Sequence, residues 1–518
     1  MTLFSLENLY QQYILCRKNK RNTVNALRFE ARQELNLLEL QEALVSRSYK
    51  PNRSVCFFVK HPKLREVFAA DFTDRVVHHI LVSHLEKTWE KIFIHDSYAC
   101  RKGKGVHAGV MRLQQFMRQA TANGTRPAWY LQLDIHNYFM SIDKQRLFDM
   151  LAARLNLKHE EDAQAHWLTH TLVFHDCTVA AHIKGDPALV HRLPPHKTLF
   201  HAPPGKGLPI GNLNSQFFAN VYLNALDQFV KHELKCQWYL RYCDDFVLLA
   251  TSLEQLQIYK QRIEVFIAEQ LDLSLNPTRL RLRPISDGVD FLGYIVRPFH
   301  LLVRRRVLGH LHEVLQKSQA VLVHPHANGT EYRFDVEELD TLQASFSSYL
   351  GHLRYAACHR LIQSIGVAHP WLKVYFGLRR KTLQLFRRDR LPKPGAVRTV
   401  QAQYQYWREA FPDDVILIQV GAFYERLQWP VRRNSLHEQS GKKQGVAGLR
   451  RMRSNRRGAV EGFPLHQLRR RVAAWLAAGQ SVLVVAQSHT AGGRLLQRRP
   501  KARWRATSTQ GCTGCDSK

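Results

Sequence analysis

Three acidic residues of this chain stand in stretches that are otherwise apolar and strand-like. Asp134 lies near the end of AWYLQLDI at 128–135, and Asp244 and Asp245 are neighbours in RYCDDFVLLA at 241–250. Neighbouring carboxylates repel each other, and burying them is costly unless a cation or hydrogen bonds compensate the charge. An Asp-Asp pair by itself is typical of a tight turn. The alternative is a divalent metal site, because Mg²⁺ prefers carboxylate oxygens, which neighbouring strands can supply.

A metal site of this kind would suit nucleotidyl transfer. Bound cations lower the charge on the attacking hydroxyl, the transferred phosphate and the leaving pyrophosphate. Basic side chains are also required nearby, because metal ions alone do not neutralise a triphosphate.

The acids need a sheet to bring them together. The pattern predicts a buried strand at 128–135, a strand, acidic turn and strand at 237–250, and an amphipathic helix at 215–234. With the short strands LRLRP and VDFLGYIV, this mixture predicts an α+β fold. The pattern turns helical from about residue 300, and a basic segment with Pro and Gly at 386–398 has the composition of a linker.

The overall charge points to a polyanionic partner. Lys and Arg number 75 against 43 Asp and Glu, a formal net charge of +32. This excess favours nucleic acid, with an anionic membrane surface as the alternative. Apolar runs are too short to span a membrane, and the N-terminus does not have the pattern of a signal peptide. Nine mostly scattered cysteines suit a reducing cytoplasm, and the pair Cys512 and Cys515 supplies only half of a zinc site.

Several segments together resemble reverse transcriptases, including those of group II introns. YCDD at 242–245 resembles the YxDD box of the family, and LQLDIHNYFMSID resembles its first acidic motif. RKGKGVHAG, LPIGNLNSQFFANVYLN and FLGY at 291–294 also fall in the family's order. The resemblance covers about residues 20–390. It implies a right-hand polymerase, with fingers, a palm whose antiparallel sheet carries YxDD, and a helical thumb, followed by a small α/β unit.

The implied domains follow the chain in order. They are an N-terminal and fingers region at 1–125, a palm with a fingers insertion at 126–298, a helical thumb at 299–385, the linker at 386–398, a nucleic-acid-binding unit at 399–490, and a basic, disordered tail at 491–518.

The resemblance also assigns roles to residues of the polymerase. Asp134, Asp244 and Asp245 would be the catalytic acids, and the Ile135 carbonyl would join them around two Mg²⁺ ions, for which Mn²⁺ could substitute. Asp245 could turn partly away from the metals, because side chains alternate along a strand. The predicted primer grip consists of Phe291, Leu292, Gly293 and Tyr294. Nucleotide binding is assigned to Lys63, Arg65, Arg75, Phe139, Ile210 and Gly211.

Two residues concern the kind of polymerase and its chemistry: Phe139, one of the nucleotide-binding residues, and Arg279, which has no assigned role. Phe139 occupies the family's steric-gate position, where a ring would collide with a ribose 2′-OH and favour deoxynucleotides. Arg279 stands where relatives often have a lysine that could protonate pyrophosphate, and arginine is a poor acid because it stays protonated.

The motif at 208–216 departs from most relatives. It has Ile210-Gly211 where many have Gln-Gly, and Ser215-Gln216 where many have Ser-Pro. This combination resembles the enzymes of diversity-generating retroelements, which copy a template-repeat RNA into cDNA with errors at adenines. A glutamine can hydrogen-bond beside the nascent pair, whereas a β-branched alkyl group offers only shape. Fidelity is therefore assigned to Ile210, Ser215 and Gln216.

The C-terminal unit has a resemblance of its own. DDVILIQVGAFYERL at 413–427 and GFPLHQLRRRVAAWLAAGQSVLVVAQ at 462–487 resemble the first, mismatch-recognising domain of MutS. Phe423 would stack on a mismatched base and Glu425 would hydrogen-bond to it. Arginine clusters in WPVRRN, LRRMRSNRRG and LRRRVAAW favour phosphate contacts.

The implied protein is an RNA-directed DNA polymerase of a bacterial or phage-encoded diversity-generating retroelement, located in the cytoplasm. Its implied partners are template RNA, cDNA, RNA–DNA heteroduplex, deoxynucleoside triphosphates and a small basic helical accessory protein, with no membrane. Two alternatives stay open: an intron-type or defence-associated reverse transcriptase without programmed mutagenesis, and a catalytically inactive nucleic-acid-binding protein.

Overall fold

The computed structural model divides the chain into two compact units, Met1–Leu301 and Leu302–Lys518. The boundary lies near residue 298, where the palm was predicted to end. The structure describes residues 2–18, 23–60, 63–327, 329–379, 381–390, 399–420, 422–427, 460–488 and 497–506. Every helix within these described ranges is too short or too polar to span a lipid bilayer.

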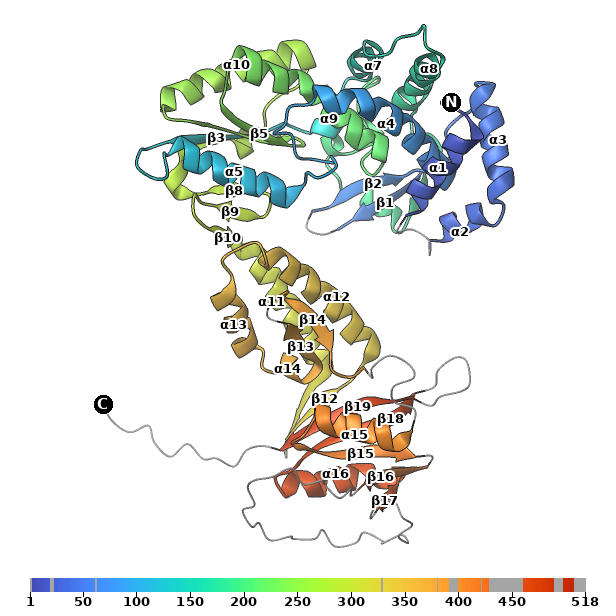
Figure 1. The fold of residues 1–518 in the computed structure, drawn as a ribbon, viewed down its shortest axis with the longest axis vertical. Coiled ribbons are helices and arrows are strands. Elements are labelled where there is room, and N and C mark those ends of the chain that lie inside the picture. The colour runs from blue at the N-terminus through green and yellow to red at the C-terminus, as the bar shows by residue number, and fades with distance from the viewer. Residues whose placement is uncertain are drawn as a thin grey trace. The chain divides into compact units, whose positions relative to one another are not determined.

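A four-stranded antiparallel sheet forms the centre of the first unit (Figure 1). Its strand order is β5-β6-β3-β7, built from β3 (Trp129–Asp134), β5 (Trp238–Tyr242), β6 (Asp245–Ala250) and β7 (Arg281–Pro284). Apolar residues of β3 and β6 are buried on both faces. The helices α10 (Leu253–Leu271) and α5 (Val106–Ala120) lie on opposite sides of the sheet in Figure 1. This sheet confirms the predicted strand–turn–strand and the α+β class.

A second, smaller sheet of this unit contains β1 (Val55–Val59), β2 (Arg65–Ala69) and β4 (His182–Lys184) in the order β2-β1-β4. The remaining hairpin joins β8 (Val289–Phe291) to β9 (Tyr294–Val296), and β10 (Leu301–Val303) spans the boundary between the units. The other helices are α1 (Leu6–Arg17), α2 (Val24–Glu30), α3 (Gln33–Val45), α4 (Phe72–Ile92), α6 (Tyr138–Ser141), α7 (Lys144–Ala152), α8 (Glu160–Phe174) and α9 (Leu213–Gln228).

Helix α9 confirms that the segment predicted at 215–234 is helical, but the prediction of one apolar and one exposed face is wrong. The last turn also differs. Residues Phe229–Glu233 form a π-helical turn rather than a continuation of the α-helix. Twelve of the sixteen residues of α9 are buried, because it packs between α4 and α10 instead of lying on the surface. The polar residues on it are therefore buried too, and they need partners.

The second unit combines helices with a seven-stranded mixed sheet. The helices are α11 (Arg305–Leu322), α12 (Val336–Leu353), α13 (His359–Ala368), α14 (Leu372–Tyr375), α15 (Val400–Ala410) and α16 (Leu468–Ala477). The sheet has the order β11-β12-β19-β18-β15-β16-β17, built from β11 (Val323–His326), β12 (Gly329–Arg333), β15 (Asp414–Val420), β16 (Phe423–Leu427), β17 (Val460–Pro464), β18 (Ser481–Ser488) and β19 (Gln497–Ala506). A separate hairpin pairs β13 (Phe376–Arg379) with β14 (Gln384–Arg387).

Two of the domain predictions are wrong in this unit. The thumb predicted at 299–385 is not purely helical, since β12 pairs with β19 and so joins the C-terminal sheet. The tail predicted to be disordered at 491–518 contains β19. This strand is basic, but Ala502, Trp504 and Ala506 alternate with its charged residues. Trp504 packs against the core, and the Arg503 guanidinium donates to the buried Asp414 carboxylate at 3.0 Å. Pairing on both sides of β19 satisfies its backbone groups, and this favours the strand.

The predicted linker at 386–398 begins later than its composition suggested. Arg387 and Asp389 are both buried and form an ion pair with an Nη2–Oδ2 distance of 2.5 Å. Close contact between the two charges offsets the free-energy cost of removing them from water. Residues 391–398 of the predicted linker lie outside the described residues.

A buried ion pair lies beneath the turn that carries Asp244. Arg241 and Asp227 are both 0% exposed, and their Nη2 and Oδ2 atoms are 2.6 Å apart. The Tyr239 hydroxyl donates to Asp227 at 2.7 Å. The Arg241 guanidinium also donates to Asn220 Oδ1 at 3.2 Å and to the Cys243 carbonyl at 3.0 Å. One guanidinium therefore ties α9 to the turn between β5 and β6.

We predict that Arg241→Ala lowers the free energy of unfolding by about 3–5 kcal/mol, because Asp227 would remain buried without its counter-charge. Urea titration of the full chain measures this change. Lys102→Ala is the control, because Lys102 pairs with Glu86 in an exposed position and should change stability by less than about 1 kcal/mol. Equal losses in the two variants would contradict the prediction.

Candidate active site

Strand pairing brings the first acidic motif beside the hairpin tip. In the β3–β6 register Asp134 lies opposite Asp245, and the Ile135 amide donates to the Asp244 carbonyl at 3.3 Å. Cys243 has a positive φ of 56°, which turns the chain sharply before Asp244. Two segments separated by more than a hundred residues therefore present carboxylates to the same place.

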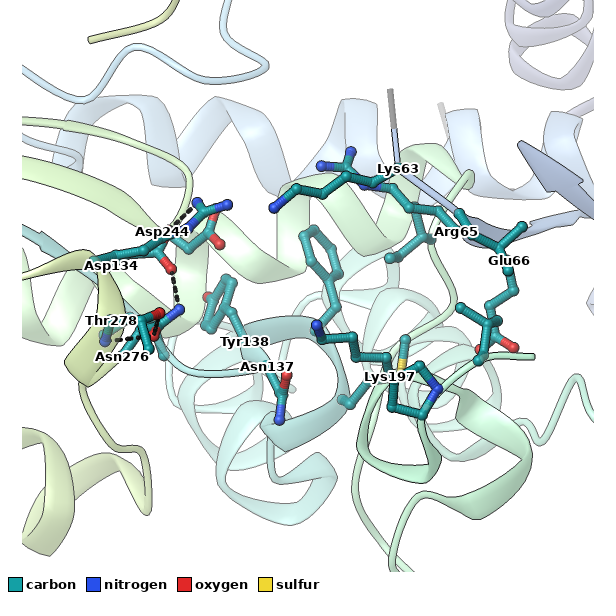
Figure 2. A pocket seen from close by; sticks show the side chains of 18 of the residues that line it. Lys63, Arg65, Glu66, Asp134, Asn137, Tyr138, Lys197, Asp244, Asn276 and Thr278 are labelled. Carbon is teal, nitrogen blue, oxygen red and sulfur yellow. Dashed lines mark hydrogen bonds and ion pairs between the residues drawn. The ribbon is translucent and has the colours of Figure 1, made fainter. Parts of the chain in front are cut away.

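Asp134 and Asp244 line one pocket of about 610 Å³ (Figure 2). Figure 2 shows the two acids on one side of the pocket, with Lys63 extending from another wall toward them. The volume is in the range of small-molecule sites. The pocket is lined by Lys63, Leu64, Arg65, Glu66, Asp134, Ile135, Asn137, Tyr138, Phe139, Met140, Arg192, Leu193, Pro194, Lys197, Ile210, Asp244, Asn276, Thr278 and Arg279.

The charge of Asp134 is partly compensated by neighbours from the segment before β7. Asn276 Nδ2 donates to Asp134 Oδ2 at 3.0 Å, and Arg279 Nη1 donates to Asp134 Oδ1 at 3.1 Å. Asp134 is buried, whereas the Arg279 side chain is half exposed. Arg279 thus forms an ion pair with a predicted metal ligand.

Asp244 is in an unfavourable position for a charged group. Burial, and then the nearby Asp134 carboxylate, raises the pKa of Asp244. A divalent cation between the two carboxylates would remove this repulsion.

Asp245 lies on the same face of the sheet as Asp134, because the two residues are directly opposite in the β3–β6 register. Its Oδ1 accepts a hydrogen bond from Gln132 Nε2 at 3.1 Å, and it does not line the pocket. Burial raises the pKa of Asp245 to about 7, with the Gln132 hydrogen bond opposing that shift. Asp245 therefore hydrogen-bonds a neighbour on β3 and is not among the lining residues, although it shares a face of the sheet with Asp134.

The donor set fits a hard cation with few protein ligands. Two carboxylates and the lining residue Ile135 supply oxygens, and Mg²⁺ usually keeps several waters or substrate oxygens. Within the described part of the chain, no group of three or more His, Cys, Asp or Glu side chains has metal-binding geometry. A cation here would be held by Asp134 and Asp244, and would need water or phosphate oxygens as well.

The structure brings four of the six predicted nucleotide-binding residues to this pocket. Lys63, Arg65, Phe139 and Ile210 line it. Arg75 does not line it, because its Nε donates to the carbonyl of Ala70 at 2.9 Å. Its position at the start of α4 explains this contact.

Gly211 does not line the pocket, but it fixes the segment that does. Its φ is +121°, and an added Cβ would lie 2.6 Å from Val67 Cγ1 and 2.8 Å from the Phe68 carbonyl oxygen. The Phe68 amide donates to the Ile210 carbonyl at 2.8 Å. Only glycine fits this close approach to β2, which holds the Ile210 backbone in register.

The other two predicted fidelity residues lie at the start of α9. Ser215 is 1% exposed, Gln216 is exposed, and neither lines the pocket. Of the fidelity residues, Ile210 alone lines this pocket.

The predicted primer grip forms the β8–β9 hairpin. Phe291 and Tyr294 are 0% exposed, and Leu292 and Gly293 form the turn with φ of 49° and 97°. The two rings belong to the core, and the turn residues are half-buried. None of the four lines the pocket.

Sequence reasoning missed several residues of the site. Gln132 and Asn276 hydrogen-bond the acids, and Glu66, Arg192 and Lys197 line the pocket. Alternation along β3 could have indicated Gln132, whose side chain lies on the same face as Asp134. The Pro- and His-rich composition around Arg192 gave no signal.

In the second unit, Phe423 and Glu425 alternate with Tyr424 on β16. Phe423 is 41% exposed, whereas Tyr424 is buried in the core that packs against α16. Burial raises the pKa of Glu425, while the nearby Arg498 guanidinium lowers it. Phe423 and Glu425 therefore share the other face of the sheet. The arginine clusters at 429–434 and 449–458, and Cys512 with Cys515, lie outside the described residues.

Comparison with known proteins finds a family match in the first unit. Residues 58–296 match the family described as reverse transcriptase (RNA-dependent DNA polymerase). The chain contains a reverse transcriptase domain. The matched residues of this domain include Asp134, Asp244 and the β3–β6 pair.

The reverse transcriptase domain is related to group II intron-encoded proteins. The chain is 22% identical over 297 residues to the group II intron-encoded protein LtrA of Lactococcus lactis subsp. cremoris, and equally to that of strain MG1363. Each match covers 45% of this chain and 45% of LtrA, so the chain spans less than half the length of these curated relatives.

Two solved telomerase structures are also similar. Apo telomerase from Candida tropicalis, truncated from its C-terminal domain, has a TM-score of 0.37 and 10% identity, covering 49% of this chain and 55% of that chain. Telomerase from Candida albicans, in complex with a TWJ fragment of telomeric RNA, has a TM-score of 0.33 and 11% identity, covering 63% and 59%.

Proposed function

We propose that the reverse transcriptase domain is an RNA-directed DNA polymerase whose active site contains Asp134 and Asp244. The observation that carries this proposal is the β3–β6 pairing, which brings both carboxylates into one pocket walled by Lys63 and Arg65. The substrates are deoxynucleoside triphosphates and a primer on template RNA, and the product is cDNA in an RNA–DNA heteroduplex. The net charge of +32 suits these polyanions.

In this proposal, the acidic residues of the pocket bind the cations and the basic residues bind the triphosphate. Asp134 and Asp244 would hold Mg²⁺ or Mn²⁺, with the Ile135 carbonyl as a further ligand. When bound, the cations supply charge neutralisation at the primer hydroxyl and the phosphates. Lys63 and Arg65 bind the triphosphate through charge-assisted hydrogen bonds.

Two further residues have supporting roles in this proposal. Phe139 lies at the wall of the pocket, where its ring limits the space for a ribose 2′-OH. Asp245 supports the site through its hydrogen bond from Gln132, which ties β6 to β3 beside the acids.

We predict that Asp244→Asn reduces primer extension on an RNA template at least about 100-fold, because a ligand that positions the cation loses its charge. The assay compares single-nucleotide incorporation rates with Mg²⁺. Asp149→Asn is the control, since Asp149 is exposed on α7 away from the pocket. Unchanged extension by the Asp244 variant would overturn the polymerase assignment and favour an inactive nucleic-acid-binding protein.

We further propose that copying is mutagenic, as in diversity-generating retroelements, with a template-repeat RNA as template and errors at adenines. Support comes from Ile210, which lines the pocket. Its backbone is fixed beside β2, because its carbonyl accepts a hydrogen bond from the Phe68 amide. Its branched alkyl side chain cannot hydrogen-bond a base pair, so it rejects mispairs by shape alone. In this proposal the protein also works with a small basic helical accessory protein.

We predict that Ile210→Gln lowers the error frequency opposite template adenines about tenfold, the effect of ~1.4 kcal/mol of added discrimination. Sequencing of the cDNA made by each variant measures it. Ile258→Gln on the exposed face of α10 should leave the error spectrum unchanged. Rare or evenly distributed errors in the unsubstituted protein would instead support an intron-type or defence-associated enzyme without programmed mutagenesis.

The second unit is proposed to bind duplex or mismatched nucleic acid. An exposed aromatic ring and a carboxyl group on the same face of β16 are suited to stacking on a base and hydrogen-bonding its edge. The likeness of this segment to the mismatch-recognising domain of MutS adds to this proposal.

We predict that Phe423→Ala weakens binding of a mismatched RNA–DNA heteroduplex by about 1–3 kcal/mol, roughly 5- to 150-fold, because one stacking contact is lost. Fluorescence anisotropy with matched and mismatched duplexes measures the affinities. Phe299→Ala removes a ring that is 64% exposed elsewhere and serves as the control. If Phe423→Ala has no effect on either duplex, the unit does not read mismatches through this residue.

A further inference from the structure

The Pro- and His-rich insertion at 184–207 forms one wall of the active-site pocket. It contains three short 3₁₀ turns, Pro187–Leu189, Pro195–Lys197 and Leu199–His201. Four of its residues line the pocket: Arg192, Leu193, Pro194 and Lys197. The insertion is therefore part of the site rather than a distant surface loop.

A buried carboxylate fastens this wall to β2. Glu66 is 1% exposed, accepts a hydrogen bond from Thr198 Oγ1 at 2.6 Å, and also accepts one from the Leu199 amide. The rings of Phe68 and Phe200 lie 5.7 Å apart beside it. Charge-assisted hydrogen bonds in a buried position hold their partners firmly. Lys197, the residue before Thr198, is thereby kept at the pocket.

The two cations of the wall, Arg192 and Lys197, have no acidic partner among the residues that the structure describes. Arg192 and Lys197 are exposed, and no ion pair joins either side chain to another of the described residues. By contrast, Arg279 in the same pocket is paired with Asp134, and Glu66 is engaged by Thr198 and Leu199. Uncompensated positive charge facing a pocket favours an anionic ligand.

The direction of the side chains suggests which anion. Figure 2 shows Lys63 and Lys197 on opposite walls of the pocket, and both extend toward the side where Asp134 and Asp244 lie. An anion that reaches the acids through bound cations while touching both walls must carry several charges. The phosphates of a nucleotide satisfy this description.

We propose that Arg192 and Lys197 form a second cationic wall of the nucleotide site and bind the phosphates of the incoming deoxynucleoside triphosphate, opposite Lys63 and Arg65. This assignment rests on the proposed polymerase function and adds residues that the motifs of the sequence did not indicate. Glu66 is a positioning residue in it, because it acts through Thr198 and Leu199.

Single-nucleotide incorporation tests the second wall. The double variant Arg192→Ala, Lys197→Ala should raise KM for the deoxynucleotide about 10-fold or more, while kcat changes less than about threefold, because binding contacts are lost. Lys197→Arg keeps the charge and should stay within about threefold of the unsubstituted protein. Lys184→Ala is the matched control, since Lys184 is an exposed cation of the same insertion that does not line the pocket.

A second measurement separates nucleotide binding from turnover. With a primer that ends in a dideoxynucleotide, the apparent Kd of the next deoxynucleotide is obtained without chemistry, and it should rise about 10-fold in the double variant. An unchanged nucleotide Kd overturns the inference. If the Kd of primer–template rises instead, the wall binds nucleic acid, and the inference is equally wrong. If the unsubstituted protein binds nucleotide in this complex but never extends an ordinary primer, the polymerase proposal fails while the wall assignment stands.

Discussion

The placement of the Asp134 and Asp244 carboxylates in one pocket is the constraint on which the candidate site depends. Strand pairing forces the two acids together in a largely buried place, where the pKa of Asp244 is raised by burial and by Asp134. The protein compensates only part of this charge, through Arg279 and Asn276 on Asp134. The buried ion pair of Arg241 and Asp227 stabilises the turn between β5 and β6, because Arg241 also donates to the Cys243 carbonyl. A site kept in this state is suited to a cation brought with an anionic substrate.

The surrounding elements place cationic side chains in the same pocket as these acids. β2 and the residues just before it supply Arg65 and Lys63 at one wall of the pocket. Gly211 allows the Ile210 segment to approach β2 closely enough for a backbone hydrogen bond. The insertion supplies a further wall, fastened by Glu66. Cationic side chains therefore line several sides of the pocket that contains the two acids. This placement is consistent with the large excess of Lys and Arg in the chain.

Local pattern in the sequence predicted the elements that carry the acids, because their apolar periodicity is strong and their turn is short. The strand–turn–strand at 237–250 and the helix over α9 were predicted in this way. Contacts between distant segments left no such signal in the sequence. Lys197, for example, is held at the pocket because the next residue, Thr198, hydrogen-bonds Glu66 on β2. Arg75 stands close to a matching motif, yet it hydrogen-bonds Ala70. The basic residues of β19 resemble a disordered tail until their pairing with β12 and β18 is known.

Direct measurement of cation binding tests the central claim, that Asp134 and Asp244 together form a divalent-ion site. Electron paramagnetic resonance can count Mn²⁺ ions bound to the full chain, with Asp149→Asn as a control for the loss of an exposed acid. The account predicts saturable binding in the unsubstituted protein and in the control, and its loss in the double variant Asp134→Asn, Asp244→Asn. Equal Mn²⁺ affinity in all three proteins would contradict it.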